Sequence, residues 1–254
     1  MNWPLPLWIA HRGAGKLAPE NTLAAFRLGA AHGFCAFECD VKLSAEGVPF
    51  LLHDDTLDRT TNARGVAGER SWAALSQVDA GAWHSAAYAG EPMPSLAAVA
   101  SYVRNNGFAL NLEIKPTTGQ DHRTGSVVGR ECLRWWPETP RALLLSSFQP
   151  EALHGAREAA PELPRALLLD SLPAGWWEMV ISLDCAAVVT NHRLMDAPLL
   201  QRLHAAGLRG LCYTPNDTSD VQRLLTLGID GIITDAVDRF APAPSTSTSR
   251  SQPG

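Results

Sequence analysis

Residues 36–55 read AFECDVKLSAEGVPFLLHDD, and this stretch decides the fold class. It contains two short apolar runs, Ala36–Val41 and Val48–Leu52, of the kind that forms buried strands. The six residues between the runs are far fewer than the roughly twelve that a crossover between parallel strands needs. The two runs therefore predict an antiparallel hairpin that turns at Ala45-Glu46-Gly47.

Seven more apolar runs lie before and after the hairpin, and most are followed by a polar turn and a helix-like stretch. These runs are Leu7–Ala10, Ala109–Ile114, Ala142–Ser146, Ala166–Leu169, Ala187–Thr190, Leu208–Tyr213 and Gly231–Thr234. Strands that alternate with helices are typical of an α/β fold with a parallel sheet and helices outside it. Once the returning run of the hairpin is assigned to the hairpin alone, eight parallel strands remain, which predicts a (β/α)8 barrel.

Four helices are expected from capping residues and apolar spacing. They are Thr22–Ala31, Pro150–Ala159, Ala197–Ala206 and Asp217–Leu227. In the first of them, Asn21 is a residue type that caps helix N-termini, and Gly33 is one that ends helices. We therefore expect Asn21 to be an N-cap.

The length of 254 residues suits one domain, since single α/β barrels of about 250 residues are common. We expect this domain to cover residues 1–240. No strand is evident over about 54–107, so we expect a small insertion there that covers one side of the site. Residues 241–254 are rich in Ala, Pro, Ser and Thr, a composition that predicts a disordered tail.

The charge balance narrows the range of partners. The net charge is −5, so the chain lacks the basic surface that binds nucleic acid or an anionic membrane. No apolar run reaches the roughly 18 residues of a membrane span, and residues 1–10 contain neither Lys nor Arg, unlike a secretory signal. We therefore expect a cytoplasmic protein without a membrane anchor. Five widely spaced cysteines without a CxxC motif are interpreted as small buried hydrophobic residues.

Three acidic residues fall near the carboxyl ends of the predicted strands, where the active sites of such barrels lie. Glu38 and Asp40 are two positions apart on one strand, so both side chains point to the same face. Glu113 supplies a third carboxylate from another strand. Oxygen ligands without Cys or a His triad suit a hard divalent cation such as Mg²⁺ or Ca²⁺. The alternative is an ion network in which these acids pair with Arg12 or Lys115.

Two histidines accompany these acids. His11 ends the first predicted strand, and His53 ends the returning run of the hairpin. About six residues lead away from Asp40 and six lead back, at roughly 3.3 Å each, so His53 returns to its neighbourhood. A lone histidine at a strand end is more often packed or on the surface, but two beside a metal suit acid–base hydrolysis of an ester. His192 is a weaker candidate.

Arg12 and Lys115 add positive charge beside the acids, which on an acidic protein indicates an anionic substrate group such as phosphate. Phosphate, a hard cation and two histidines together favour metal-assisted hydrolysis of a phosphate ester. The sequence contains neither a GxxxxGK[ST] loop nor a GxGxxG fingerprint, so a kinase or dehydrogenase lacks support.

Several motifs in a fixed order resemble those of the glycerophosphodiester phosphodiesterases, of the cytoplasmic bacterial type. The motifs are His11-Arg12-Gly13, Pro19-Glu20-Asn21-Thr22, Glu38-Cys39-Asp40-Val41, His53-Asp54, Leu57-Asp58-Arg59-Thr60-Thr61, Glu113-Ile114-Lys115-Pro116, Ser146-Ser147-Phe148, Tyr213-Thr214-Pro215-Asn216 and Asp230-Gly231-Ile232-Ile233-Thr234-Asp235.

The resemblance implies a TIM-type barrel that hydrolyses deacylated phospholipids to glycerol 3-phosphate and an alcohol. By position, His11 and His53 match an acid–base pair. Glu38, Asp40 and Glu113 match the ligands of one divalent cation, Mg²⁺ or Ca²⁺, and Arg12 and Lys115 match phosphate contacts. The nucleophile is either water or the glycerol 2-hydroxyl, and either histidine can be the base.

Two other functions are compatible with the same residues. One is lysophospholipase D hydrolysis of an intact lysophospholipid, which a long apolar groove would favour. The other is a non-catalytic barrel that binds a phosphate ester, although such a protein would be expected to have lost a histidine or a carboxylate. Tyr213 and Pro215 depart from the residues common in the family, so the pocket for the alcohol or glycerol is left open.

Overall fold

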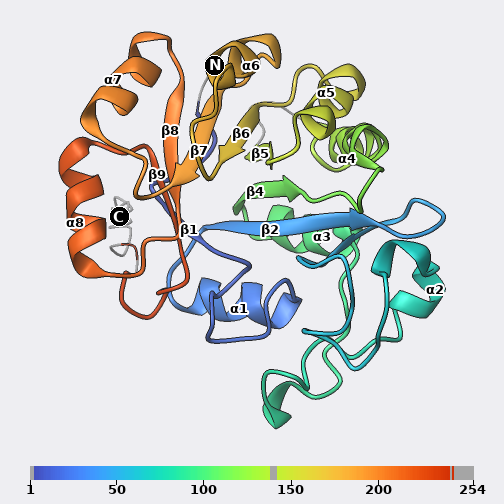
Figure 1. Cartoon of the computed structure of the whole chain (residues 1–254). Coiled ribbons are helices and arrows are strands. Elements are labelled where there is room, and N and C mark those ends of the chain that lie inside the picture. The colour runs from blue at the N-terminus through green and yellow to red at the C-terminus, as the bar shows by residue number, and fades with distance from the viewer. Residues whose placement is uncertain (1–2, 138–141, 241, 243–254) are drawn as a thin grey trace, which may run out of the picture.

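The computed structural model describes residues 3–137, 142–240 and 242, and over these residues it forms a barrel of parallel strands with helices on the outside (Figure 1). The strands are β1 (Trp8–Ala10), β2 (Ala36–Leu43), β3 (Pro49–Leu51), β4 (Ala109–Ile114), β5 (Leu143–Ser147), β6 (Arg165–Leu169), β7 (Ala187–Asn191), β8 (Arg209–Tyr213) and β9 (Gly231–Thr234). All except β3 run parallel, and β1 closes the ring by pairing with both β2 and β9. The predicted (β/α)8 barrel is confirmed.

The hairpin predicted from residues 36–55 is also present. β3 runs antiparallel to β2, with Val41 opposite Leu51. At the end of this pairing the backbone N–H of Leu52 donates to the carbonyl oxygen of Asp40, at 3.1 Å. The hairpin therefore returns the chain to the rim of the barrel, where His53 follows.

Helices occupy the connections between the parallel strands. They are α1 (Leu23–Ala31), α2 (Trp72–Leu75), α3 (Leu96–Asn105), α4 (Asp121–Trp135), α5 (Pro150–Ala159), α6 (Trp176–Ser182), α7 (Ala197–Ala205) and α8 (Thr218–Leu227). The four predicted helices correspond to α1, α5, α7 and α8 and agree to within one residue at each end. The longest helix of the described residues, α4, was not predicted.

The prediction that Asn21 caps α1 is wrong. Thr22 is the N-cap, since its hydroxyl accepts a hydrogen bond from the backbone N–H of Ala25, at 3.2 Å. Asn21 instead adopts a left-handed backbone conformation, with φ of 60°, and its side chain bonds to Asp40. Both residue types cap helices, so the sequence alone favoured the wrong one of two neighbours.

The region expected as an insertion, about 54–107, contains two different parts. Its first part leaves the barrel after β3 and packs around a small core of its own that includes Phe50, Leu57 and Leu75. In its second part, α3 places Leu96 and Val99 in the main core beneath the helices. The chain that projects from the barrel therefore ends before α3, which is one of the helices around the barrel (Figure 1).

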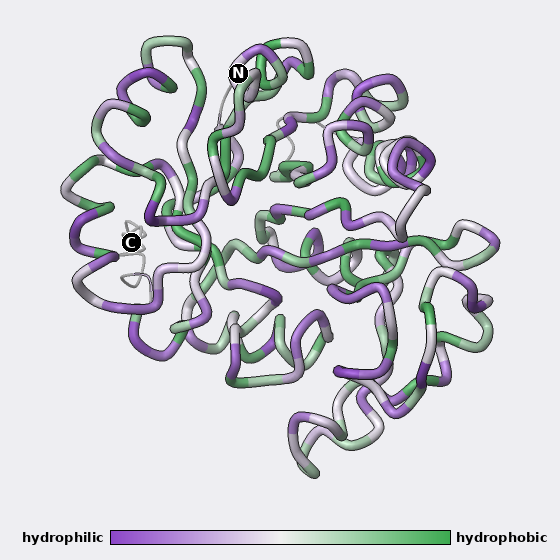
Figure 2. The backbone as a smooth tube through the Cα atoms, viewed as in Figure 1, coloured by the Kyte–Doolittle hydropathy of each residue, from purple (hydrophilic) through white to green (hydrophobic). Residues whose placement is uncertain are grey.

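The barrel interior is filled by alternate residues of the strands. They are mostly small or branched and include Ile9, Ala36, Ala109, Leu144, Ala166, Leu168, Ala187, Val189, Leu211 and Ile233. Hydrophobic and hydrophilic residues alternate along the surrounding helices, as Figure 2 shows. Each helix thus buries one apolar face against the strands and leaves the other to solvent.

Three further expectations concern the chain as a whole. The tail expected at 241–254 lies outside the described residues, apart from Pro242. Among the described helices, none combines the length and the apolar character needed to cross a membrane. Four cysteines are buried as expected, but Cys35, which directly precedes β2, is exposed.

Candidate active site

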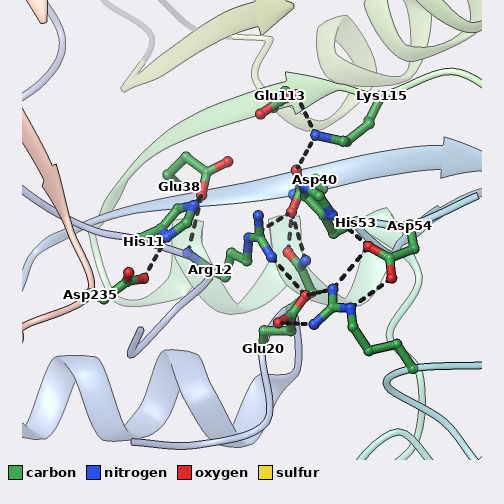
Figure 3. Close-up of polar contacts among 12 residues, drawn as sticks. His11, Arg12, Glu20, Glu38, Asp40, His53, Asp54, Glu113, Lys115 and Asp235 are labelled. Atoms are coloured by element: carbon green, nitrogen blue, oxygen red, sulfur yellow. Dashed lines mark hydrogen bonds and ion pairs between the residues drawn. The ribbon is translucent and has the colours of Figure 1, made fainter. Parts of the chain in front are cut away.

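The residues predicted to carry the chemistry lie together at the rim formed by the carboxyl ends of the barrel strands (Figure 3). They are His11, Arg12, Glu38, Asp40, His53, Glu113 and Lys115. All except Asp40 line one cavity of about 280 Å³, and Asp40 joins them through ion pairs with Arg12 and Lys115. Phe148 and Tyr213 line the same cavity, with ring centres 5.6 Å apart.

Three buried carboxylates form the centre of the site. Glu38 and Asp40 point to one face of β2, and Asp40 lies directly beside Glu113 in the pairing of β2 with β4. One oxygen from each of the three lies within 4.8 Å of the others. Such crowding of like charges is costly unless protons or cations offset it.

Burial and the neighbouring charges shift the pKa values of the three acids in different directions. Burial, together with the charges of Asp40 and Glu113, raises the pKa of Glu38 well above its usual range. Burial and the charge of Asp40 raise the pKa of Glu113 to about 7. Burial by itself would raise the pKa of Asp40 too, but Arg12 and Lys115 more than offset it and lower this pKa to about 2. Asp40 is therefore the carboxylate that stays charged throughout the neutral range.

Two cations reach into the same cluster. The Nε of Arg12 lies 3.4 Å from an oxygen of Asp40, and the Nζ of Lys115 lies 3.1 Å from Glu113 and 3.8 Å from Asp40. The ion network considered as an alternative is thus present. It leaves Asp40 Oδ1 buried without a hydrogen-bond partner in the described residues. Three carboxylates, one of them with an oxygen that accepts no hydrogen bond from the described residues, fit a hard divalent cation.

The turn after β1 has the backbone conformation that the site requires. Arg12 is left-handed, with φ of 50°, and its N–H donates to an oxygen of Glu38 at 3.1 Å. Gly13 follows with φ of 98° and lies so close to α1 that a Cβ there would come within 2.8 Å of Ala25 Cβ. Non-glycine residues in a left-handed conformation, such as Arg12, cluster at functional sites.

Asn21 fixes Asp40 from the same loop. Its amide nitrogen donates to Asp40 Oδ2 at 2.8 Å, and its amide oxygen accepts from the backbone N–H of Asp40 at 3.0 Å. Both side chains are buried. Asn21 thus holds the carboxylate and its backbone in one orientation, which the expected capping role did not reveal.

His11 is held by an aspartate from the far end of the chain. Its Nδ1 lies 2.6 Å from Asp235 Oδ1, and its Nε2 lies 3.7 Å from Glu38. Asp235 also accepts a hydrogen bond from the amide of Asn216, at 3.1 Å. Burial opposes the effect, but the hydrogen bond with His11 and the further contacts lower the pKa of Asp235 to about 2. A carboxylate at Nδ1 fixes the orientation of the ring and leaves Nε2 for chemistry.

His53 has the same kind of partner at Nδ1, which lies 2.7 Å from Asp54 Oδ1. Arg59 donates two hydrogen bonds to Asp54, of 2.6 and 2.9 Å, and also donates to both carboxylate oxygens of Glu20. Glu20 in turn accepts from Arg12 at 2.9 Å. Burial lowers the pKa of His53, while Asp40 opposes the change. Figure 3 shows the resulting chain of alternating charges that joins Arg12 to His53.

Sequence reasoning missed some of the residues that the structure brings to the site. Asp235, Asn216, Asp54 and Arg59 belong to motifs noted in the sequence, but their contacts were not predicted. Two of these contacts, His11–Asp235 and Glu20–Arg59, join residues that lie far apart along the chain. Asn111 lines the cavity, and both polar atoms of its side chain are buried without a hydrogen bond. Its place two residues before Glu113 on one strand is the signal that would have found it.

His192, the weaker histidine candidate, lies outside the cavity. It does not line the space that the other two histidines share, and its Nδ1 lies 3.6 Å from Asp220. The site is therefore a barrel rim with clustered carboxylates, two cations and two histidines that are each bound to an aspartate. This arrangement defines a site suited to metal-assisted hydrolysis of an anionic ester.

Comparison with known proteins identifies the family to which this site belongs. The glycerophosphoryl diester phosphodiesterase family matches the chain over residues 11–239. The glycerophosphodiester phosphodiesterase of Caldanaerobacter subterraneus subsp. tengcongensis is 29% identical over 90% of this chain and 93% of its own length. The chain therefore belongs to the glycerophosphoryl diester phosphodiesterase family.

Solved structures agree with this assignment. A phosphodiesterase of Oleispira antarctica, in complex with the product sn-glycerol-3-phosphate, is 36% identical, with a TM-score of 0.85 over 91% of this chain and 94% of that one. A glycerophosphodiester phosphodiesterase from Agrobacterium tumefaciens is 28% identical, with a TM-score of 0.78 over 93% of this chain and 99% of that one. The resemblance that the sequence motifs suggested is confirmed.

Proposed function

We propose that the chain hydrolyses glycerophosphodiesters to glycerol 3-phosphate and an alcohol. One observation carries the proposal: His11 and His53, each bound at Nδ1 by an aspartate, line one cavity together with Glu38 and Glu113. Membership of the family and the product bound to the Oleispira antarctica relative support this substrate class.

The carboxylates Glu38, Asp40 and Glu113 would hold one divalent cation. Their donor atoms are all oxygens, which both Mg²⁺ and Ca²⁺ prefer, so the proposal names these two ions. When bound, such an ion polarises a phosphoryl oxygen and offsets the charge that develops on it. Asp40 Oδ1 is buried without a hydrogen bond among the described residues, with only Lys115 Nζ at 3.8 Å, and so is one atom that a cation would stabilise.

Arg12 and Lys115 would bind the phosphate group. Both line the cavity and both carry a positive charge that nearby carboxylates stabilise, since the pKa of each is raised despite burial. Glu20 holds the guanidinium of Arg12 in place. A fixed guanidinium presents several N–H groups to phosphate oxygens in one plane.

The two histidines would move the protons. One takes the proton of the nucleophile, either water or the glycerol 2-hydroxyl, and the other protonates the leaving alkoxide. Both would act through Nε2, because Asp235 and Asp54 engage Nδ1 of His11 and His53. Removing a proton from the nucleophile and supplying one to the leaving group both lower the activation free energy of ester cleavage.

The shape of the site favours this reaction over the alternatives. The cavity of about 280 Å³ adjoins one of about 440 Å³ that shares Glu113, Lys115 and Phe148 and is lined mainly by polar residues. This space suits a short polar diester, whereas a lysophospholipid needs a groove for its acyl chain. A non-catalytic barrel is disfavoured because both histidines and all three carboxylates are present. The cytoplasmic location expected from the sequence is part of the proposal.

The test is release of glycerol 3-phosphate from glycerophosphocholine by the purified chain. We expect release that EDTA abolishes and that added Mg²⁺ or Ca²⁺ restores. Glycerophosphoethanolamine and lysophosphatidylcholine are compared as substrates in the same assay. Absence of release from both glycerophosphodiesters by a folded, metal-supplied sample would overturn the proposal, and faster cleavage of lysophosphatidylcholine would favour the lysophospholipase D alternative.

A further inference from the structure

A second cluster of metal-ligating side chains lies away from the barrel rim. His122 is in the first turn of α4, and His154 and Glu158 are one turn apart on α5. His122 Nε2 lies 3.0 Å from one oxygen of Glu158, and His154 Nδ1 lies 3.5 Å from the other. One ligand atom from each residue lies within 4.8 Å of the others. We call these three residues the α4–α5 cluster.

The backbone beneath the cluster is held rigidly. α4 and α5 lie side by side (Figure 1) and approach so closely that a Cβ on Gly155 would overlap the carbonyl oxygen of His122. A Cβ on Gly125 would likewise overlap the carbonyl oxygen of Ala152. The helices therefore cross through direct backbone contact beside the cluster. This contact sets the distance between the backbone of His122 and the helix that carries His154 and Glu158.

The donor set differs in kind from that at the rim. Two imidazoles and one carboxylate are ligands of Zn²⁺ and its neighbours in the first transition row, whereas Mg²⁺ and Ca²⁺ prefer oxygen alone. The ring centres of His122 and His154 are 5.8 Å apart, and a nitrogen of each ring lies near the Glu158 carboxylate. About half of each of the three side chains is exposed, which leaves an open path for an ion and room for a bound water.

We propose that the α4–α5 cluster binds a divalent transition-metal ion of the zinc type, separate from the cation at the rim. Histidine nitrogens from α4 and α5 and a carboxylate oxygen from α5 supply three ligands, and water completes the coordination. The ion ties the first turn of α4 to α5. That turn follows the segment at Pro116 and Gly119, which lines the cavity beside the active site.

The test is a Zn²⁺ titration of the full chain by calorimetry, with the bound ion counted after desalting. The wild type is compared with His154→Ala and with Glu158→Gln, which leave the rim untouched. His204→Ala is the matched control, because His204 is also exposed on a helix and meets a carboxylate, Asp230 at 2.7 Å, but has no second histidine in its contacts. The binding readout is independent of substrate and of the proposed function.

The wild type and His204→Ala should bind one more Zn²⁺ ion per chain than either cluster variant. Since losing a group that merely supports a ligand costs about 10- to 100-fold in affinity, losing a ligand should weaken this site by at least about tenfold. Zn²⁺ should also raise the thermal midpoint of the wild type more than that of the variants. Equal stoichiometry and affinity in all four proteins would overturn the proposal. If His154→Ala fails to fold, as judged by circular dichroism, Glu158→Gln decides the question in the same way.

Discussion

The two histidines of the rim are held from different parts of the molecule. His11 is bonded to Asp235, and the strands that precede these residues, β1 and β9, are neighbours in the barrel. His53 is bonded to Asp54, which Arg59 holds from the segment that leaves the barrel after β3. The side chain of Asp235 is 18% exposed, that of Asp54 is 27% exposed, and that of Arg59, which holds Asp54, is 45% exposed. One histidine is thus fixed by the scaffold and the other by a surface network.

This difference predicts that the contacts that hold His11 and those that hold His53 differ in their sensitivity to salt and to mutation. Asp235 is only 18% exposed and directly follows a barrel strand, so salt should weaken its contact with His11 less than it weakens an exposed ion pair. An exposed ion pair contributes little and weakens as salt is added. The scaffold side of the site should therefore be intolerant of change, and the side built by the projecting segment should be adjustable.

The largest effect should come from removing either histidine. His11→Ala and His53→Ala should each lower kcat for glycerophosphocholine by about 10²- to 10⁴-fold, the range that a general acid or base contributes. Both variants should fold, because each side chain is partly exposed at the rim. His204→Ala is the control and should retain wild-type turnover. Near wild-type activity in either rim variant would show that the acid–base assignment is wrong.

The next largest effect on kcat should come from replacing the aspartates that hold the two histidines, and it should differ between Asp235 and Asp54. Asp235→Asn should lower kcat by about 10- to 100-fold, by analogy with carboxylates that orient metal-bound histidines, whose loss costs about that much. Asp54→Asn should lower it less, since its surroundings are more open and the segment can adjust. Steady-state kcat and KM for both variants provide the measurement. A larger loss for Asp54→Asn than for Asp235→Asn would refute the distinction between the two sides.

The sequence predicts those parts of the molecule that depend on local spacing. Six residues between two apolar runs require a hairpin, and the hairpin places His53 beside Asp40. A spacing of two on a strand puts Glu38 and Asp40 on one face. Each of these inferences uses a distance along the chain shorter than about 20 residues, so the extended geometry of the backbone is enough to make it.

The sequence does not predict features that depend on which distant residues meet. Asp235 lies 224 residues from His11, and only closure of the barrel brings them together. The choice between Asn21 and Thr22 as the cap of α1 depends on Asp40, which draws the Asn21 side chain away from the helix. The family motifs include these residues but do not state their partners. Their roles therefore require the structure.

A smaller effect is expected at Arg59 itself. Arg59→Ala should reduce kcat/KM up to about fivefold, because exposed ion pairs contribute about 0.2–1 kcal/mol. The loss should be clearest at low ionic strength and should shrink as salt is added. Arg64→Ala is the matched control, since Arg64 is 87% exposed in the same segment and pairs with Asp58 instead. An equal loss in the control would assign the effect to the segment's net charge and not to Asp54.

The last effect is on stability at low pH, not on turnover, and concerns Asp235 alone. The pKa of Asp235 is lowered to about 2 in the folded chain, below its ordinary value of 3.8. The carboxylate therefore stabilises the fold above about pH 4, and this contribution is lost as the pH falls toward about 2. By linkage it amounts to at most about 2.4 kcal/mol. The difference in unfolding free energy between wild type and Asp235→Asn, measured with denaturant, should thus narrow from about pH 4 downward. Arg64→Ala, which keeps Asp235, should follow the wild-type curve, and a difference that stays constant with pH would mean that the carboxylate acts through its shape alone.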